Sequence, residues 1–157
     1  MSKTLLAVSL ALAIAGASSA NAADTFYAGV NTGGVVTNGV NKDTPWTVGA
    51  IAGMNVFAVG SAKAAVEGSF DYDKNESKVL MANIVPNFTI GNMTPYALAG
   101  IGYSWAPTGD QSKYNVGLGV KYAVTSNIDV DARYRRINNF NNNMADDRVT
   151  LGLNFKF

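Results

Sequence analysis

The 157-residue sequence contains neither cysteine nor histidine. Without cysteine, an exported protein must fold without disulfides, which argues against a small disulfide-stapled scaffold. Without histidine, the commonest general base and a frequent metal ligand are missing, which leaves carboxylate chemistry or serine and lysine arrangements for catalysis. The formal net charge of +1 favours neither nucleic acid nor an acidic partner. We therefore expect no nucleic-acid binding, no metal site and no cofactor.

Long apolar runs are also missing, except near the N-terminus. Lys3 precedes an apolar run over residues 5–16, and small residues follow at Ala20 and Ala22. A charged start, an apolar middle and an A-x-A site are typical of a secretory signal peptide. A retained anchor is the alternative, but the run is shorter than the roughly 20 apolar residues of a spanning helix. The predicted parts are a cleaved signal peptide, residues 1–22, and one exported domain, residues 23–157.

In the exported part, apolar and polar residues alternate with a period of two, and helical spacing is hard to find. The alternation predicts eight strands, at residues 25–35, 46–58, 62–72, 78–90, 95–105, 113–123, 128–138 and 148–157. Most exceed the usual five or six residues of globular strands. Tight turns at 59–61, 91–94 and 124–127 alternate with longer connections at 36–45, 73–77, 106–112 and 139–147. This layout is typical of an antiparallel up-and-down barrel that crosses a bacterial outer membrane.

The two faces of each predicted strand differ in chemistry. In residues 127–137, one face carries Ile128, Val130, Ala132 and Tyr134, and the other carries Asp129, Asp131, Arg133 and Arg135. The interior of an eight-stranded barrel is just wide enough to be filled by side chains, so glycine and short polar residues suit it better than many large aromatics. We therefore expect the apolar faces to contact lipid and the charged faces to line the lumen. The alternative is a soluble, lipocalin-like periplasmic binder with its apolar faces inward.

Aromatic residues gather near the ends of the predicted strands. Amphipathic rings settle at membrane–water interfaces, so these residues predict two girdles. The girdle at the end with the longer loops is Trp46, Tyr72, Trp105, Tyr114 and Tyr134. The girdle at the end with the tight turns is Phe26, Phe88 and Tyr122, together with Phe155 and Phe157.

The candidate functional residues are the charges predicted to face the lumen. They are Lys63, Glu67, Asp71, Lys121, Asp129, Asp131, Arg133, Arg135, Arg148 and Lys156. An unpaired buried charge costs several kcal/mol, so these residues must pair or be hydrated. We expect a network of ion pairs that plugs the barrel, and an ion path or gate is the alternative. Asp129 and Asp131 are two residues apart on one face, but their basic neighbours favour neutralisation over acid–base catalysis.

The stretches TPYALAGIGYSW, KYNVGLGVKYAVTSNIDVDARYRRI and VTLGLNFKF resemble the small opacity-protein and outer-membrane-protein-A-like barrels of Gram-negative bacteria. The likeness covers nearly all of the exported part. It implies an all-β fold, an eight-stranded antiparallel up-and-down transmembrane β-barrel in the outer membrane. It also implies that Leu153, Phe155 and Phe157 form the signal that the barrel-assembly machinery recognises. The barrel enzymes known in this membrane rely on histidine, so its absence argues against an enzyme.

Together these patterns predict a monomeric, non-enzymatic structural surface protein, exported by its signal peptide to the outer membrane of a Gram-negative cell. Its expected partners are the outer-membrane lipid and the assembly machinery. Two further functions stay open beside the soluble binder. One is an adhesin or opacity-type protein that contacts a host surface through residues 36–45 and 139–147, and the other is a narrow ion-conducting porin.

Overall fold

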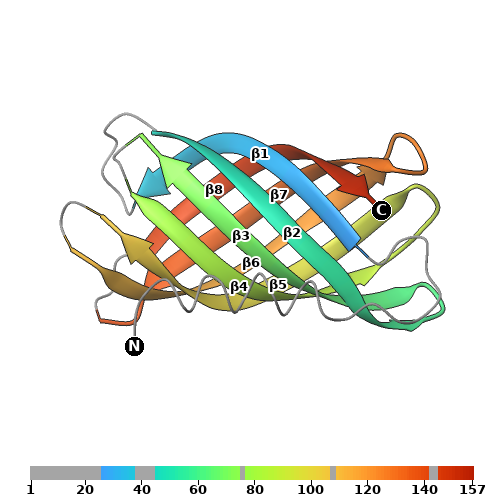
Figure 1. The fold of residues 1–157 in the computed structure, drawn as a ribbon, viewed down its shortest axis with the longest axis horizontal. Coiled ribbons are helices and arrows are strands. Elements are labelled where there is room, and N and C mark those ends of the chain that lie inside the picture. The colour runs from blue at the N-terminus through green and yellow to red at the C-terminus, as the bar shows by residue number, and fades with distance from the viewer. Residues whose placement is uncertain (1–25, 38–44, 75–76, 107–108, 142–144) are drawn as a thin grey trace.

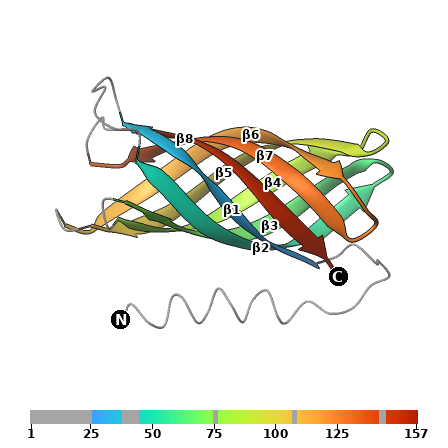
Figure 2. The ribbon, with the colours of Figure 1, turned by 90° about the horizontal axis from the view of Figure 1, so that it is seen from above.

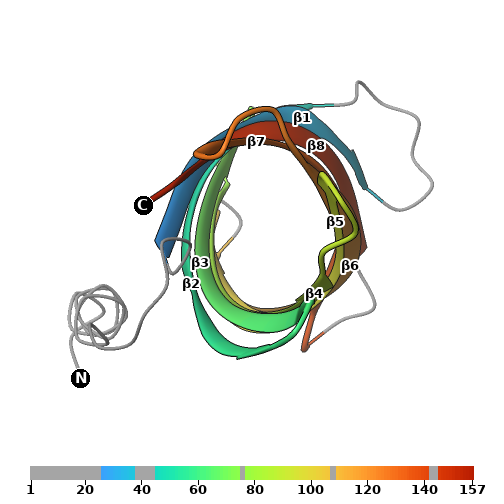
Figure 3. The ribbon, with the colours of Figure 1, turned by 90° about the vertical axis from the view of Figure 1, so that its right-hand side faces the viewer.

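The computed structural model describes residues 26–37, 45–74, 77–106, 109–141 and 145–157. They form the strands β1 (Phe26–Thr37), β2 (Trp46–Val59), β3 (Ala62–Asp73), β4 (Lys78–Phe88), β5 (Met93–Trp105), β6 (Gln111–Ala123), β7 (Ile128–Asn139) and β8 (Ala145–Lys156). Each strand pairs antiparallel with its neighbours in the chain, and β1 also pairs with β8, so the sheet closes into a barrel (Figures 1 and 2). The closed ring is visible along the barrel axis in Figure 3. The predicted fold class is confirmed.

Within these described residues, no helix is long and apolar enough to cross a membrane. The predicted signal peptide, residues 1–22, lies outside the described part of the chain.

The two ends of the barrel are named here by their connections. The turn end holds residues 60–61, 89–92 and 124–127, and the loop end holds residues 38–45, 74–77, 106–110 and 140–144. At two of the tight turns, Gly60 and Gly91 have φ angles of 58° and 59°. A side chain is disfavoured in this left-handed region, so glycine lets the chain reverse within a few residues.

The observed strands extend further into the loop end than the alternation predicts. β8 begins at Ala145 instead of residue 148, because Ala145 and Asp146 pair with Asn138 and Ile137 of β7. β3 likewise continues to Asp73, which pairs with Thr47. Backbone pairing needs no apolar side chain, so the ladder persists where the alternation fades. The connections at the loop end are therefore shorter than predicted, and the two ends differ less in loop length.

The apolar faces of the strands point outward. Val30 and Leu151 are each 61% exposed, whereas Glu67 and Arg135 are fully buried at 0%. The predicted orientation is confirmed, and the soluble, lipocalin-like alternative with apolar faces inward is wrong. Closure gives every strand two hydrogen-bonded neighbours, which is what a sheet in hydrocarbon requires, because lipid offers the backbone no partners.

The aromatic residues assigned to the loop-end girdle lie near that end on β2, β3, β5 and β6. Trp46 begins β2 and its ring lies 6.3 Å from that of Tyr72 on β3. Trp105 ends β5, and Tyr114 near the start of β6 packs 5.0 Å from Phe140, between ring centroids. Tyr134 lies nearer the middle of β7, but its hydroxyl donates a hydrogen bond to Asp147 Oδ1 at 2.7 Å.

The residues assigned to the turn-end girdle occupy the opposite ends of their strands. Phe26 begins β1, Phe88 ends β4 and Tyr122 is the next-to-last residue of β6. On β8, Leu153 and Phe155 face outward, and Phe157 directly follows the strand with 70% of its surface exposed. The two aromatic zones therefore lie on either side of the outward apolar band.

A charge on the outer face should destabilise the barrel most at mid-strand. Leu118 is 63% exposed near the middle of β6, so we expect Leu118→Arg to cost about 2–4 kcal/mol, because the guanidinium would face hydrocarbon. The matched control is Val124→Arg at the turn end, which should cost about 0–1 kcal/mol. Reversible urea unfolding in lipid vesicles measures both variants. Equal costs at the two positions would contradict the lipid contact of Leu118.

Candidate functional site: the charged interior

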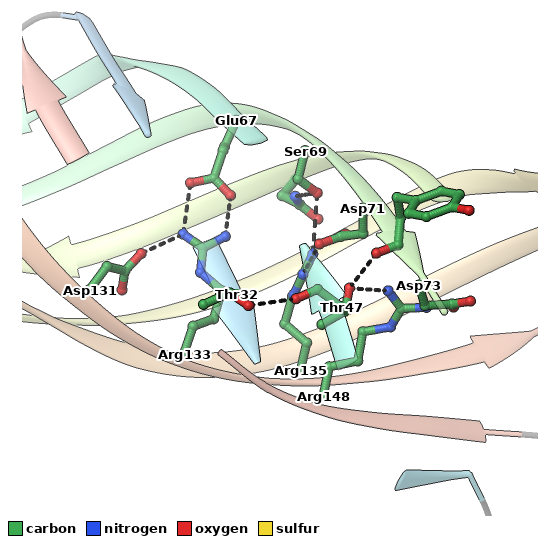
Figure 4. Close-up of polar contacts among 12 residues, drawn as sticks. Thr32, Thr47, Glu67, Ser69, Asp71, Asp73, Asp131, Arg133, Arg135 and Arg148 are labelled. Carbon is green, nitrogen blue, oxygen red and sulfur yellow. Dashed lines mark hydrogen bonds and ion pairs between the residues drawn. The ribbon is translucent and has the colours of Figure 1, made fainter. Parts of the chain in front are cut away.

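The interior charges come mainly from β3, β7 and β8, where acidic and basic residues occupy inward-facing positions. β3 turns Glu67, Asp71 and Asp73 inward, and β7 turns Arg133 and Arg135 inward. In the closed strand order, β3 and β7 are four strands apart in either direction, so they face each other across the lumen. Ion pairs between these strands therefore span the barrel (Figure 4).

Arg133 is the centre of the largest cluster. Its Nη1 lies 2.6 Å from Glu67 Oε1 and its Nη2 lies 3.0 Å from Glu67 Oε2, so the guanidinium grips the carboxylate with two hydrogen bonds. Nη2 also donates to Asp131 Oδ2 at 3.0 Å, and Nε donates to the Tyr96 hydroxyl at 2.7 Å. Paired and hydrogen-bonded in this way, the guanidinium can remain charged although Arg133 is only 3% exposed.

Two tyrosines complete the cluster around Arg133. The Tyr27 hydroxyl donates to Glu67 Oε2 at 3.0 Å, and the Tyr96 hydroxyl donates to Asp131 Oδ1 at 2.6 Å. Both carboxylates thus accept hydrogen bonds from an aromatic side chain as well as from the guanidinium. We expected aromatic residues to point away from the narrow interior, and these two tyrosines are an exception.

Glycine makes room for the two inward rings. Tyr27 pairs across the ladder with Gly53, and Tyr96 pairs with Gly119. A Cβ added to Gly53 would lie 2.5 Å from Tyr27 Cζ, and one added to Gly119 would lie 2.4 Å from Tyr96 Cζ. Each ring therefore covers the bare backbone of a glycine. Lys121 Nζ lies 3.8 Å from the centroid of the Tyr27 ring, within reach of a cation–π interaction.

Two further ion pairs lie on the loop-end side of this cluster. Arg135 Nη2 lies 2.7 Å from Asp71 Oδ1, and neither side chain has any exposed surface. Arg148 Nη2 lies 3.2 Å from Asp73 Oδ2, and its Nη1 donates to Thr47 Oγ1 at 3.4 Å (Figure 4).

Weaker, partly exposed pairs lie nearer the two ends of the barrel. Lys113 Nζ lies 3.6 Å from Asp146 Oδ2 at the loop end, and Lys156 Nζ lies 3.0 Å from Asp129 Oδ1 at the turn end. With the three cross-barrel clusters, they form a series of ion pairs along the whole lumen.

The structure places eight of the ten predicted lumen charges in ion pairs. These are Glu67, Asp71, Asp129, Asp131, Arg133, Arg135, Arg148 and Lys156. The other two are Lys121, which contacts the tyrosine rings, and Lys63. Lys63 is half-buried on β3, and no carboxylate of the described residues lies within 4 Å of its ammonium. A lysine near the open end of a barrel can stay hydrated, so it needs no ionic partner.

Sequence reasoning missed three members of the series, Asp73, Lys113 and Asp146. Asp73 lies two residues after Asp71, and Asp146 lies two residues before Arg148, so both continue the inward face of a predicted strand. The period-two signal is therefore present, but polar residues at these positions are equally typical of the adjoining loops, to which the alternation assigns them. Lys113 begins a predicted strand and has the same parity as Lys121.

The interior carboxylates have little freedom to act as acids, bases or metal ligands. In the described strands, each of the six inward carboxylates has a basic partner within 4 Å. Asp129 and Asp131 pair with different residues, Lys156 and Arg133, instead of sharing a proton. Across the described ranges, no group of three potential metal ligands comes together.

A sequence model of the family described as "Outer membrane protein beta-barrel domain" matches residues 4–157. No curated protein sequence matches significantly. Among solved structures, the chain is similar to Neisserial surface protein A, with 20% identity and a TM-score of 0.62 over 84% of this chain and 97% of that one. It is also similar to Ail, the attachment invasion locus protein of Yersinia pestis, with 14% identity and a TM-score of 0.59 over 85% and 97% of the two chains. The outer membrane enzyme PagL matches with 12% identity and a TM-score of 0.56 over 83% and 99%. Identities this low show a shared fold and nothing more.

Removing the central guanidinium should destabilise the barrel strongly. Arg133→Met leaves Glu67 and Asp131 buried without their partner, and breaking a buried pair in this way costs about 3–5 kcal/mol. Arg136→Met is the matched control on the same strand. The Arg136 side chain is 50% exposed and lies 3.9 Å from Asp147, so its loss should cost about 0–1 kcal/mol.

Urea unfolding in vesicles measures the stability of these variants, of Glu67→Gln and of the double variant Arg133→Met/Glu67→Gln. We expect the double variant to lose less stability than Arg133→Met and Glu67→Gln lose in sum, because replacing Glu67 removes the charge that Arg133→Met leaves unpaired. Additive losses would show that Arg133 and Glu67 do not interact.

Proposed function

This chain belongs to the family of outer membrane protein beta-barrel domains, and on that premise we propose that it is a non-enzymatic structural protein of the outer membrane with a closed lumen. The observation that carries the proposal is a pair of buried ion pairs between opposite walls of the barrel, which we call the cross-barrel ties. Arg133 to Glu67 and Arg135 to Asp71 each connect β7 with β3 across the interior. A continuous aqueous path would have to pass both ties.

Opening such a path is energetically unfavourable. Separating Arg133 from Glu67 without a new partner leaves two buried charges, each with a desolvation penalty of several kcal/mol. The interior is also filled by apolar side chains, and Ile51, Val85 and Leu98 are all at most 4% exposed beside the tyrosines. An eight-stranded barrel has little spare width beyond its own side chains. These features favour a plugged lumen over a narrow porin.

The charged interior disfavours catalytic activity, whereas the shared fold is compatible with enzymes and non-enzymes alike. PagL is an enzyme with a similar barrel. In the present chain histidine is absent, and the inward carboxylates of the described strands are already neutralised by arginine or lysine. A general base must be free to accept a proton from a substrate, and a carboxylate held by a guanidinium is a poor one.

Export and insertion complete the proposed function. The signal peptide at residues 1–22 directs the chain out of the cytoplasm, and the barrel-assembly machinery recognises Leu153, Phe155 and Phe157. Supporting this assignment, Leu153 and Phe155 are each 45% exposed on the outer face of β8. The barrel then stands as a monomer in lipid, because a closed sheet has no free edge with which to pair.

Attachment to a host surface is the second candidate function. The observation that favours it is Phe140, which follows β7 at the loop end and is 58% exposed beside Tyr114. An exposed aromatic residue on a polar loop is a typical contact point for a protein partner. Cells carrying Phe140→Ser or deletions in residues 36–45 and 139–147 should attach less well than wild-type cells. Unchanged attachment would reject the adhesin function and leave the structural function intact.

Planar bilayer recording tests the closed lumen directly. We expect the purified, refolded protein to show no large, stable conductance, because the cross-barrel ties block the path. The double variant Arg133→Ala/Arg135→Ala removes both ties and should raise the conductance, whereas Arg136→Ala, the exposed control, should not. Large and steady currents through the wild-type protein would overturn the plugged lumen and favour the porin.

A further inference from the structure

The outer surface of the barrel carries an apolar groove that crosses β3, β2, β1, β8 and β7, with a volume of about 700 Å³. We call it the outer trough. Its floor is formed by Gly49, Asn31 and Gly152, which are cross-strand partners on β2, β1 and β8. The side chain of Asn31 belongs to the inward face of β1, so the floor of the trough is essentially bare backbone.

Two rows of outward side chains form the sides of the outer trough. The row nearer the loop end consists of Tyr72, Val48, Thr32 and Leu151, and the other row consists of Phe70, Ala50, Val30, Leu153 and Val130. Residues two apart on a strand are separated by about 6.6 Å, which leaves room for one extended hydrocarbon chain between the rows. Neighbouring strands lie ~4.8 Å apart, so the four steps from β3 to β7 span about 19 Å. This length is comparable with the roughly 15 Å of hydrocarbon in one membrane leaflet.

The outer trough rises from the middle of the barrel to the loop end. Thr32 lies near the middle of β1, whereas Tyr72 is the next-to-last residue of β3. The partner of Tyr72 on β4 is Lys78, the first residue of that strand. Lys78 therefore continues the upper row of the trough at the loop end, where the membrane meets water.

Two exposed lysines and three aromatic residues surround this end of the trough. Lys78 pairs across the ladder with Tyr72 on one side and with Trp105 on the other. The backbone N–H of Lys74 donates to the carbonyl oxygen of Trp46 at 3.1 Å, and the Trp46 ring lies 6.3 Å from that of Tyr72. Neither lysine has a carboxylate of the described strands and turns within 4 Å of its ammonium. This end of the trough therefore carries positive charge that the described residues do not neutralise.

The chemistry of the trough and of its loop end selects an anionic lipid. The apolar sides match a hydrocarbon chain, and exposed ammonium groups attract the phosphate of a head group. Aromatic rings at the membrane interface pack on the apolar faces of sugar rings. The other outward cation near the loop end, Arg136, lies 3.9 Å from Asp147 and is offset by it. Charge complementarity thus places the head group at Lys74 and Lys78.

We propose that the outer trough binds one acyl chain of a phosphorylated glycolipid, with the phosphate at Lys74 and Lys78 and the sugar beside Trp46. The site rests on the outer-membrane location in the proposed function. The longer loops of outer-membrane barrels face the exterior, so this lipid belongs to the outer leaflet. It is a resident ligand, distinct from the lipid that surrounds the rest of the apolar band.

Native mass spectrometry of the refolded protein tests the proposal. The protein is released from detergent micelles that contain equal amounts of purified lipid A, the phosphorylated glycolipid probe, and phosphatidylglycerol. We expect one molecule of lipid A to remain bound in preference to phosphatidylglycerol. Equal retention of the two lipids, or a preference for phosphatidylglycerol, would overturn the proposal.

Variants separate the head-group contact from the trough. Lys74→Gln/Lys78→Gln should lower the affinity for lipid A roughly 30-fold, which corresponds to about 1 kcal/mol for each lysine. Ala50→Phe fills the trough, keeps both lysines and should lower the affinity roughly tenfold.

Two matched controls should retain wild-type affinity. Arg136→Gln removes a loop-end cation outside the site, and Ala97→Phe adds a ring to the outward face of β5, beside Leu118. Heat-modifiable gel mobility shows that each variant is folded before the comparison. Unchanged affinity in Ala50→Phe, or equal losses in the variants and their controls, would reject the site.

The outcomes also separate this site from the proposed function. A protein that inserts into membranes but retains no lipid A rejects the outer trough as a binding site and leaves the structural function intact. A chain that fails to insert rejects both.

Discussion

The barrel depends on the ion pair between Arg133 and Glu67. β7 and β3 lie on opposite sides of the ring, so this pair and the neighbouring pair of Arg135 with Asp71 connect walls that the backbone ladder joins only through other strands. Backbone hydrogen bonds between neighbouring strands close the sheet, whereas these ion pairs occupy its interior and connect strands that are not neighbours. The buried charges around Arg133 are tolerated because Glu67 also accepts a hydrogen bond from the Tyr27 hydroxyl, and Asp131 also accepts one from the Tyr96 hydroxyl.

Packing inside the barrel is a balance between large and small side chains. Tyr27 and Tyr96 place their rings in a narrow lumen. The rings fit because Gly53 and Gly119, which lie under them, have no Cβ. The rings then supply the hydroxyls that fix Glu67 and Asp131 in place. Packing and electrostatics are thus coupled, because the residues that make space also allow the charges to be satisfied.

The period-two pattern was enough to predict the fold and its orientation. In residues 127–137 the charges recur at every second position, and a closed sheet must turn one face wholly inward. Asp73 and Asp146 were missed because polar residues beside a loop do not show where the ladder ends. The contacts of Arg133 with Glu67 and Tyr96 could not be read from one sequence, since they depend on how opposite strands are staggered around the ring. The placement of Asn83 and Asn115 on either side of Gly100 likewise depends on the register of β4, β5 and β6.

The most direct test of a tied interior is solid-state nuclear magnetic resonance on the protein in lipid bilayers. The measurement is the dipolar coupling between the guanidinium nitrogens of Arg133 and the carboxyl carbon of Glu67. A strong coupling from a rigid side chain is the predicted result, since Nη1 and Oε1 are 2.6 Å apart. A mobile, water-exposed Arg133 without coupling to Glu67 would contradict the account.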